Sequence, residues 1–317
     1  MVRFAVIGCG RISEVHLKAL SEAKNAQLCA VCDIIEEKAK KRALEYNVPY
    51  YLDIETMLKE QKPDAALIGT PSGMHGEHAE ICALNGVNVL CEKPLEITTE
   101  KIDRMIRVCE ENHVKLGGIF QRRTYTAAVA SKNAINSGNI GTPVFCSGTF
   151  NYSRTQEYYD SDAWRGTWAL DGGGALMNQA VHGIDMLIML GGDVKSVFAK
   201  CETKARNIEV EDTAAAVIKY KNGALGVMEA ATSLKDGQET VLSVSGTDGM
   251  ISFGDSEILT WNTKDGSAAP SVTDSMGGKN CAWTGVFEGH RLLVENMADA
   301  IENGTPLLIP ACDARKA

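Results

Sequence analysis

The sequence predicts an α/β protein of two domains: an N-terminal doubly wound parallel sheet and a C-terminal α/β domain with an open, largely antiparallel sheet. Its 317 residues are the length of about two domains. Up to about residue 120, short apolar runs alternate with amphipathic stretches of helix length. Beyond that point, strand-like segments follow one another through connections too short for crossover helices. We therefore expect the domains to span 1–120 and 121–317.

The first domain is expected to alternate buried strands with amphipathic helices, the pattern of a doubly wound sheet. The strands are the apolar runs 3–7, 28–32, 65–69, 87–91 and 115–119. The helices are the stretches 11–24, 35–46, 74–86 and 98–112.

The second domain is expected to begin with a helix over 125–137 and a strand over 144–150. A polar, aromatic-rich connector (158–168) and a glycine-rich entry then lead into a helix over 174–190. Strands joined by turns such as Asn222-Gly223 and Thr247-Asp248-Gly249 follow at 194–202, 210–220, 224–233, 239–245 and 250–253. The Gly/Ser-rich stretch 262–282 is expected to be a loop.

Composition argues against several classes of function. A formal net charge of -9 offers no basic face that could neutralise a nucleic-acid backbone, so nucleic acid is not an expected partner. No apolar run approaches the roughly 18 residues that span a bilayer. Met1 leads into a short apolar stretch broken by glycines rather than into a signal sequence. We expect a cytoplasmic protein with no membrane partner.

The ten cysteines are scattered and mostly lie in apolar segments, as reduced core residues do. Cys29 and Cys32 have the Cys-x-x-Cys spacing of redox and zinc motifs. They lie in a predicted strand, however, which would point their side chains to opposite faces. We interpret them as core residues, with a metal or redox pair as the alternative, and expect no metal site.

A glycine-rich turn, Gly8-Cys9-Gly10-Arg11-Ile12-Ser13, follows the first predicted strand and opens the first predicted helix. Glycines there permit a tight turn, so that Gly8, Gly10, Arg11 and Ile12 can bind a pyrophosphate at the helix N-terminus. The second strand ends at Asp33, whose carboxylate can accept hydrogen bonds from ribose hydroxyls and repels a 2′-phosphate. We predict dinucleotide binding with NAD favoured over NADP; the alternative is a structural glycine turn.

Two further turns follow predicted strands at the carboxyl edge of the sheet, where such sheets bind ligands. In the first, Thr70, Pro71 and Ser72 are predicted to hold the cofactor backbone, and His75 to lie beside the nicotinamide. The alternative is that Ser72 caps the next helix and His75 is an ordinary helix residue. In the second, Glu92-Lys93-Pro94, a proline stiffens the chain after a lysine that would project into the cleft. The alternative is a solvated surface lysine.

The last motif is Trp164-Arg165 followed by the glycine-rich helix around 172–185. Asn178, His182 and Asp185 fall at i, i+4 and i+7, which places one polar stripe on an otherwise apolar helix. Such a stripe indicates a site, and the alternative is a core histidine with satisfied hydrogen bonds.

Together these motifs resemble the Gfo/Idh/MocA oxidoreductase family, which includes inositol dehydrogenase, glucose-fructose oxidoreductase and several nucleotide-sugar dehydrogenases. The similarity extends to Phe120-Gln121-Arg122-Arg123 and Val210-Glu211-Asp212-Thr213, and so covers essentially the whole chain. It implies a Rossmann domain joined to an α/β domain whose open sheet is often a dimer or tetramer interface. The family's catalytic lysine falls on Lys93 and its catalytic histidine on His182. Inositol dehydrogenase-like members have an aspartate where this chain has Asn178. With asparagine there, the motif around His182 looks more like that of sugar or nucleotide-sugar dehydrogenases.

The expected function is NAD-dependent oxidation of a secondary hydroxyl on a sugar or sugar derivative, with nucleotide sugars among the candidates. His182 would be the general base, and Lys93 would stabilise the developing alkoxide. Glu92, Lys93 and Gln121 complete the predicted cofactor contacts. The predicted substrate-binding residues are Lys93, Arg123, Tyr158, Trp164, Arg165, Asn178 and His182.

Two other functions of this fold stay open. One is an NAD-dependent glycoside hydrolase, which oxidises the sugar transiently before elimination. Such enzymes tend to be longer and exported. The other is a non-catalytic NAD-sensing regulator, which lacks the catalytic lysine, whereas this chain has both Lys93 and His182.

The chain is also expected to form a homodimer or homotetramer. After the strands between Val194 and Phe253, no helix-rich sequence is left to cover the second face of the sheet, so another subunit is expected to bury it. The chain ends at Ala317, where family members usually continue into another helix, so its last residues are expected to start an element.

Overall fold

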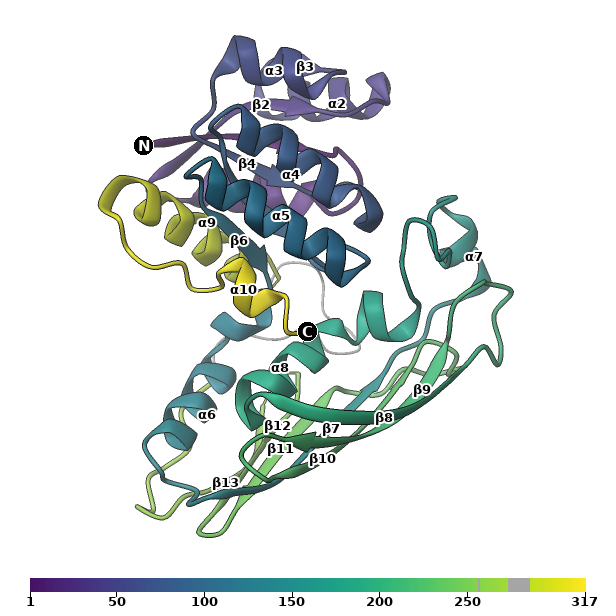
Figure 1. Ribbon diagram of the computed structural model, residues 1–317, viewed down its shortest axis with the longest axis vertical. Helices are drawn as coiled ribbons and strands as arrows, with labels where there is room; N and C mark the ends of the chain where they lie inside the picture. Colours follow the sequence, from purple (N-terminus) through teal and green to yellow (C-terminus); the bar gives the residue numbers. More distant parts are fainter. Residues whose placement is uncertain (256, 273–285) are drawn as a thin grey trace. The chain divides into compact units, whose positions relative to one another are not determined.

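The computed structural model describes residues 1–255, 257–272 and 286–317, and it divides into two compact units (Figure 1). The first unit contains 1–120 and 286–315, and the second contains 121–285 and 316–317. The boundary after Phe120 lies where the sequence pattern changes. The segment 286–315 differs from expectation, because the sequence placed it in the second domain and it packs in the first unit.

The first unit is built on a six-stranded parallel sheet with the order β3-β2-β1-β4-β5-β6. Every neighbouring pair in it is parallel, and chain order reverses between β1 and β4. The doubly wound sheet predicted from the sequence is confirmed. Its strands are β1 (Val2–Ile7), β2 (Ala26–Cys32), β3 (Tyr50–Tyr51), β4 (Ala65–Ile68), β5 (Asn88–Glu92) and β6 (Leu116–Ile119).

Helices follow most of these strands. They are α1 (Ser13–Glu22), α2 (Glu36–Tyr46), α3 (Ile54–Gln61), α4 (His75–Leu84), α5 (Thr99–Glu111), α9 (Val286–Asn303) and α10 (Ala311–Ala314). The sequence did not predict β3 and α3, which are too short to show a clear period. No helix in the described part of the chain has both the length and the apolar character that crossing a membrane requires.

The helix α9 joins the first unit through polar and apolar contacts. The side chain of Asn25 donates to the Glu295 carbonyl at 3.0 Å and to Asp299 at 2.8 Å. After α9, the amide of Gly118 in β6 donates to the carbonyl of Ile309 at 3.0 Å. The end of the described chain therefore returns to the sheet that the first 120 residues build.

The second unit contains a seven-stranded sheet with the order β13-β12-β11-β7-β10-β9-β8. Its neighbours are antiparallel except β7 and β10, which confirms the largely antiparallel sheet. The strand β13 was not predicted, and residues 273–282 of the expected loop lie outside the described residues. The strands are β7 (Pro143–Asn151), β8 (Val194–Glu202), β9 (Thr213–Tyr220), β10 (Leu225–Ala231), β11 (Val241–Gly246), β12 (Met250–Phe253) and β13 (Ile258–Asn262).

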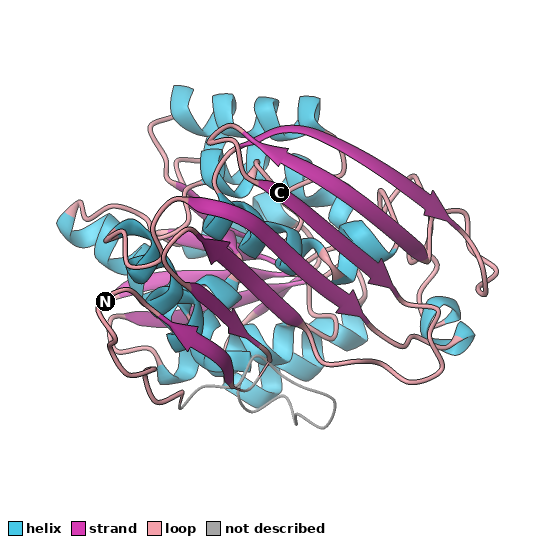
Figure 2. Cartoon of the chain, turned by 90° about the horizontal axis from the view of Figure 1, so that it is seen from below, coloured by secondary structure: helices cyan, strands magenta, loops and turns pink. Residues whose placement is uncertain are grey.

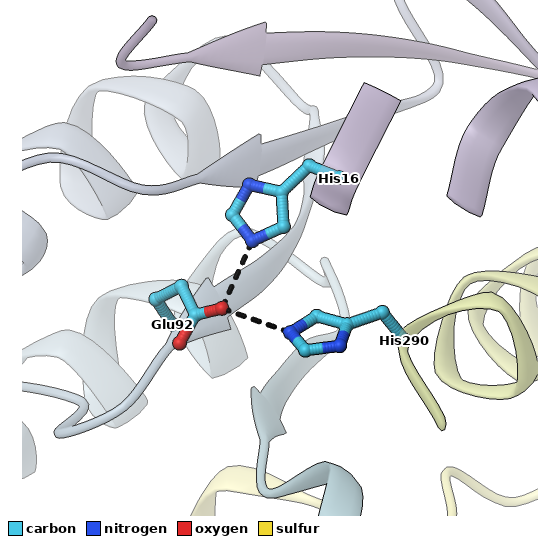
Figure 3. A group of neighbouring side chains, drawn as sticks. All are labelled: His16, Glu92 and His290. Carbon is cyan, nitrogen blue, oxygen red and sulfur yellow. Dashed lines mark hydrogen bonds and ion pairs between the residues drawn. The ribbon is translucent and has the colours of Figure 1, made fainter. Parts of the chain in front are cut away.

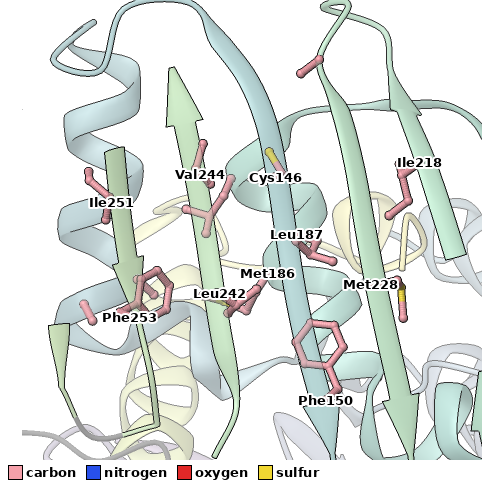
Figure 4. Packing of buried hydrophobic residues seen from close by; sticks show 14 of the residues in the cluster. Cys146, Phe150, Met186, Leu187, Ile218, Met228, Leu242, Val244, Ile251 and Phe253 are labelled. Atoms are coloured by element: carbon pink, nitrogen blue, oxygen red, sulfur yellow. The ribbon is translucent and has the colours of Figure 1, made fainter. Parts of the chain in front are cut away.

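Helices of the second unit cover one face of this sheet. The core between them includes Phe150, Leu187, Leu242 and Phe253 (Figure 4). The expected continuous helix over 174–190 is instead a π-helical turn followed by an α-helix. The helical segments are η2 (Gln121–Thr124), α6 (Thr126–Asn136), α7 (Gln156–Asp160), η3 (Ala175–Gln179) and α8 (Val181–Gly191).

The other face of this sheet carries exposed apolar side chains and is seen without a covering helix among the described residues (Figure 2). Phe198, Val217 and Val227 lie opposite one another on β8, β9 and β10, and are therefore on the same face. Their exposed fractions are 70%, 52% and 39%. An apolar row of this kind is typical of a surface that another molecule buries.

A buried carboxylate holds the start of β9. Asp212 is fully buried and accepts hydrogen bonds from the backbone amides of Lys204, Ala205 and Arg206 at 2.8 to 2.9 Å. Burial alone would raise the pKa of Asp212, but the hydrogen bonds from Ala205, Lys204 and their neighbours outweigh it and lower the pKa. The family-like sequence around Asp212 thus has a structural role in closing the connection between β8 and β9.

We predict that Asp212→Ala lowers the free energy of unfolding at pH 7 by about 3 kcal/mol, because buried amides lose their acceptor. The folded-state pKa lies below the unfolded value, so the carboxylate stabilises the protein above the unfolded pKa. That stability is lost as pH falls through the folded pKa. In urea denaturation, the difference in free energy of unfolding between wild type and Asp212→Ala should therefore become smaller below about pH 4. Asp193→Ala, which removes exposed ion pairs, is the control. The prediction would be contradicted if Asp212→Ala lowered the free energy of unfolding at pH 7 no more than Asp193→Ala does.

Candidate cofactor and substrate sites

The glycine-rich turn after β1 has the geometry that a pyrophosphate requires. Gly8 has φ +97°, and a Cβ there would lie 2.7 Å from the carbonyl oxygen of Gly69. A Cβ at Gly10 would meet no described atom within 4 Å, so space is open above that residue. Within the described chain, no side chain caps the N-terminus of α1. The turn therefore presents Gly8, Gly10, Arg11 and Ile12 at a helix N-terminus that an anion fits.

Asp33 fastens this turn to the end of β2. One carboxylate oxygen accepts from the amide of Cys9 at 2.8 Å, and the other accepts from the amide of Ile35 at 2.8 Å. Each oxygen retains a second lone pair, so Asp33 can still accept from ribose hydroxyls. The residues at this edge thus fit a dinucleotide.

The turn after β4 is tied to the turn after β5 by His75. This buried ring lies 2.9 Å from the carbonyl oxygen of Thr70 and 2.8 Å from that of Pro94, measured from its two nitrogens. Burial lowers the pKa of His75. Since both nitrogens face backbone carbonyls, only the carbon atoms of the ring remain to contact a nicotinamide. Next to it, Ser72 is buried at the start of a short 3₁₀ turn and Pro71 precedes it.

Lys93 is partly exposed in the turn after β5, where the Lys93–Pro94 peptide bond is cis. Its neighbour Glu92 is buried, and both carboxylate oxygens accept hydrogen bonds from the protein. Two of these partners, His16 and His290, were missed by sequence reasoning. His16 could have been noticed as a histidine on the apolar side of the predicted helix 11–24, whereas no element had been predicted around His290.

In the second unit, Glu211 anchors the glycine-rich segment that leads to His182. Its carboxylate accepts from the amides of Gly174 and Leu176, both at 2.9 Å. A Cβ at Gly174 would lie only 1.6 Å from the carbonyl oxygen of Glu211, so this contact requires glycine. His182 follows in the first turn of α8 and is partly exposed. Sequence reasoning noted Glu211 without giving it this role.

The polar stripe predicted on this helix has partners inside the second unit. Asn178 lies in η3 and donates to Asp171 at 2.8 Å. Asp185 is buried on α8 and accepts two hydrogen bonds from the guanidinium of Arg123. Arg123 therefore has a protein partner. The side-chain oxygen of Asn178 accepts from Gln179 at 3.4 Å and has a second lone pair that a ligand could use.

Three of the predicted substrate residues lie together. The guanidinium of Arg165 is 4.6 Å from the ring centroid of Tyr158 and 4.7 Å from that of Trp164. Arg165 also donates to the Tyr158 hydroxyl at 2.7 Å, and so does Gln179 at 3.1 Å. The guanidinium of Arg165 is also paired with the carboxylate of Asp162 at 3.1 Å, so the half-buried cluster combines two aromatic rings with an ion pair.

Gln121 lies in η2, at the start of the second unit. It is buried, and the described residues offer its Oε1 no hydrogen-bond partner. An amide oxygen in this state is one that a bound ligand could satisfy.

A hollow of about 630 Å³ in the first unit is not part of this arrangement. It is lined by Lys62 and Pro63 before β4 and by Asn85, Gly86 and Val87 before β5, together with residues of α3. Ligands of open parallel sheets bind at the carboxyl ends of the strands, and this hollow lies at the amino ends.

The chain matches two family models. Residues 2–119 match an oxidoreductase family with an NAD-binding Rossmann fold, and residues 129–252 match the GFO/IDH/MocA C-terminal domain. The chain belongs to the Gfo/Idh/MocA oxidoreductase family.

This oxidoreductase is similar to several dehydrogenases along most of its length. It is 30% identical over 259 residues to the myo-inositol 2-dehydrogenase of Thermotoga maritima, covering 79% of this chain and 74% of the relative. It is 26% identical to the scyllo-inositol 2-dehydrogenase (NAD(+)) of Bacillus subtilis, covering 99% and 90%. A crystal structure of the WlbA dehydrogenase from Bordetella pertussis, in complex with NADH and UDP-GlcNAcA, is 30% identical with a TM-score of 0.89, covering 99% of this chain and 92% of that one.

Proposed function

We propose that this oxidoreductase transfers a hydride from a secondary hydroxyl of a sugar or sugar derivative to NAD. The observation that carries the proposal is the carboxyl edge of the six-stranded sheet. There the glycine turn, Asp33 and the Thr70 turn fit a dinucleotide, and Lys93 follows the next strand of the same sheet. The inositol dehydrogenases similar to this chain support a polyhydroxylated substrate.

Bound NAD would supply the hydride acceptor. The amides of the glycine turn would hold its pyrophosphate, and Asp33 would accept from the ribose hydroxyls. Thr70, Pro71 and Ser72 would line the cofactor beyond the pyrophosphate. We include Glu92, His75 and Gln121 among the cofactor residues, with Glu92 and His75 acting chiefly by holding the turns in place.

Lys93 and His182 would act on the reacting hydroxyl. The ammonium group of Lys93 would donate a hydrogen bond to the hydroxyl oxygen and stabilise negative charge that develops on it. The imidazole of His182 would accept the hydroxyl proton, since its basicity suits a base working near neutral pH. Glu211 would orient His182 indirectly, by anchoring the segment that begins its helix.

A sugar carrying an anionic group, such as a nucleotide sugar, is the substrate class that we favour. The rings of Tyr158 and Trp164 offer apolar faces for a sugar, and Arg165 beside them, although paired with Asp162, offers further guanidinium donors for an anionic group. Asn178 would contact a substrate hydroxyl. Arg123 would act from the position that its ion pair with Asp185 gives it. UDP-GlcNAcA is the sugar in the similar WlbA complex.

The test is NADH formation with a panel of free sugars, inositols and UDP-sugars, including a carboxylated UDP-sugar and its uncharged counterpart. We expect NADH to form with at least one carbohydrate of the panel. At equal substrate concentration, NADH should form faster with the carboxylated UDP-sugar than with its uncharged counterpart. Cleavage of aryl glycosides without net NADH would instead indicate a glycoside hydrolase. NAD binding without turnover of any carbohydrate would indicate a non-catalytic regulator.

We predict that Lys93→Ala and His182→Ala each lower kcat by about 100-fold or more while leaving the Kd for NAD nearly unchanged. Each variant removes one group that touches the reacting hydroxyl, and neither is expected to hold the pyrophosphate. Steady-state kinetics and calorimetry with NAD provide the two measurements. Lys18→Ala, which removes an exposed lysine on α1, is the control. Near-normal turnover of either variant would remove that residue from the mechanism.

We predict that NAD binds at least about tenfold more tightly than NADP, because Asp33 would face the 2′-phosphate. Asp33→Asn should narrow that margin, since the amide removes the charge and keeps one acceptor for the Cys9 amide. Calorimetric titration of the wild type and of Asp33→Asn with NAD and with NADP measures the ratio of the two Kd values. Equal or tighter binding of NADP by the wild type would overturn the preference for NAD.

We also propose that the apolar face of the seven-stranded sheet is buried in a homodimer or homotetramer. The row of Phe198, Val217 and Val227 supports this, because an exposed apolar row on a flat sheet favours association. Val217→Lys should lower the mass in solution to that of a monomer at micromolar concentration, as measured by light scattering. Leu84→Lys, at a leucine 68% exposed on the first unit, should leave the mass unchanged. A monomeric wild type would sink the idea.

A further inference from the structure

A buried cluster in the first unit consists of His16 from α1, Glu92 at the end of β5 and His290 from α9. Oε1 of Glu92 lies 2.9 Å from Nε2 of His16 and 3.2 Å from Nε2 of His290. Figure 3 shows both rings directed at the same carboxylate oxygen. Three elements that are distant in the chain thus meet one residue before Lys93.

The carboxylate of Glu92 is ionised in this cluster. Burial would raise the pKa of Glu92, but hydrogen bonds from His16 and His290 hold that pKa well below its usual value. Burial lowers the pKa of His16, so its ring is neutral at pH 7. An ionised carboxylate can only accept, and both rings therefore donate from Nε2. The buried anion depends on these two donors for its charge-assisted hydrogen bonds.

The second oxygen of Glu92 connects the cluster to the proposed catalytic lysine. Oε2 accepts from the backbone amide of Lys93 at 3.0 Å. Two donors on Oε1 restrict rotation of the carboxylate, and the position of Oε2 is thereby fixed. The backbone at Lys93 is then held by a group whose own orientation is supported by surrounding hydrogen bonds.

Hydrogen bonding explains the cluster better than a metal ion does. Two imidazoles and a carboxylate are a known ligand set for zinc and iron. A metal-bound imidazole almost always donates its second nitrogen to an acceptor. Among the described residues, however, Nδ1 of His16 has no hydrogen-bond partner.

We propose that His290 is a positioning residue for Lys93. Together with His16 it holds the Glu92 carboxylate, which in turn holds the backbone amide of Lys93 in place. This makes α9, which follows the second unit in the chain, a necessary part of the site. The proposal rests on the role of Lys93 in the proposed function.

The test compares three variants of the full chain. His290→Leu replaces the imidazole with an apolar side chain of similar size and so removes the hydrogen-bond donor to Glu92. His290→Gln keeps an amide donor near the position of Nε2. Val294→Ala trims a fully buried side chain one turn further along the same helix and removes no hydrogen-bonding member of the cluster, and so reports loosened packing near His290. If His290→Leu does not fold, His290→Ala takes its place.

The first readout needs no substrate. Lys93 is acetylated with a water-soluble activated ester, and its rate is followed by peptide mass spectrometry. With a lysine released from its fixed position, His290→Leu should react at least about threefold faster than wild type, whereas His290→Gln and Val294→Ala should not. The second readout is kinetic. His290→Leu should lower kcat by about 10-fold or more with little change in KM or in the Kd for NAD, since misplacing a reacting group affects mainly the chemical step.

The positioning role would be overturned if His290→Leu had the same rate of Lys93 acetylation and the same kcat as the wild type. Equal effects of His290→Leu and Val294→Ala would also overturn it, because packing would then account for both. Stoichiometric zinc or iron in the purified protein, lost in His290→Leu, would replace the proposal with a metal site. A failure of the proposed function is distinguishable, because carbohydrate turnover would then be absent or unaffected by Lys93→Ala, while the acetylation result would still stand.

Discussion

The carboxyl edge of the six-stranded sheet is the constraint on which the rest of the structure depends. Parallel strands end at one edge, so turns that are distant in the chain come together there. Side chains then fix these turns to one another. Asp33 fastens the glycine turn to the end of β2, and the ring of His75 lies between the carbonyl oxygens of Thr70 and Pro94, to one of which its single N–H donates. The site is therefore held by polar contacts between turns that are distant in the chain.

In the second unit, two consecutive acidic residues, Glu211 and Asp212, hold connecting segments in place. Glu211 turns outward from the strand connection to hold the amides of Gly174 and Leu176, while Asp212 holds the amides that precede β9. Adjacent residues thus anchor two different segments. This explains how a segment rich in glycine, which is costly to order, can deliver His182 at a defined place. The free-energy cost of ordering this segment is offset in part by hydrogen bonds from its own amides to a carboxylate outside it.

Local patterns in the sequence predicted most elements, but not their long-range partners. The apolar runs that became β1, β2, β4, β5 and β6 were recognisable because a strand buried on both faces is continuously apolar. The predicted helix over 174–190 was read as continuous, since an apolar period does not reveal a π-helical turn. The domain that takes up α9 could not be predicted either, because an amphipathic pattern says that a face is buried and not by what. The same limit hid Asp185 as the partner of Arg123, and His290 as a partner of Glu92.

Three buried carboxylates show why such partners matter for function. Asp212 is held by three backbone amides, which among substitutions only proline would remove, and by the hydroxyl of Thr213. Asp185 is held by a guanidinium, which brings its own charge. Glu92 is held on one oxygen by two imidazoles, and one of them comes from α9. Within the described residues, Glu92 thus takes side-chain donors from two separate helices, α1 and α9. Sequence changes in α9 can therefore alter the turn that carries Lys93 without altering any residue that contacts substrate.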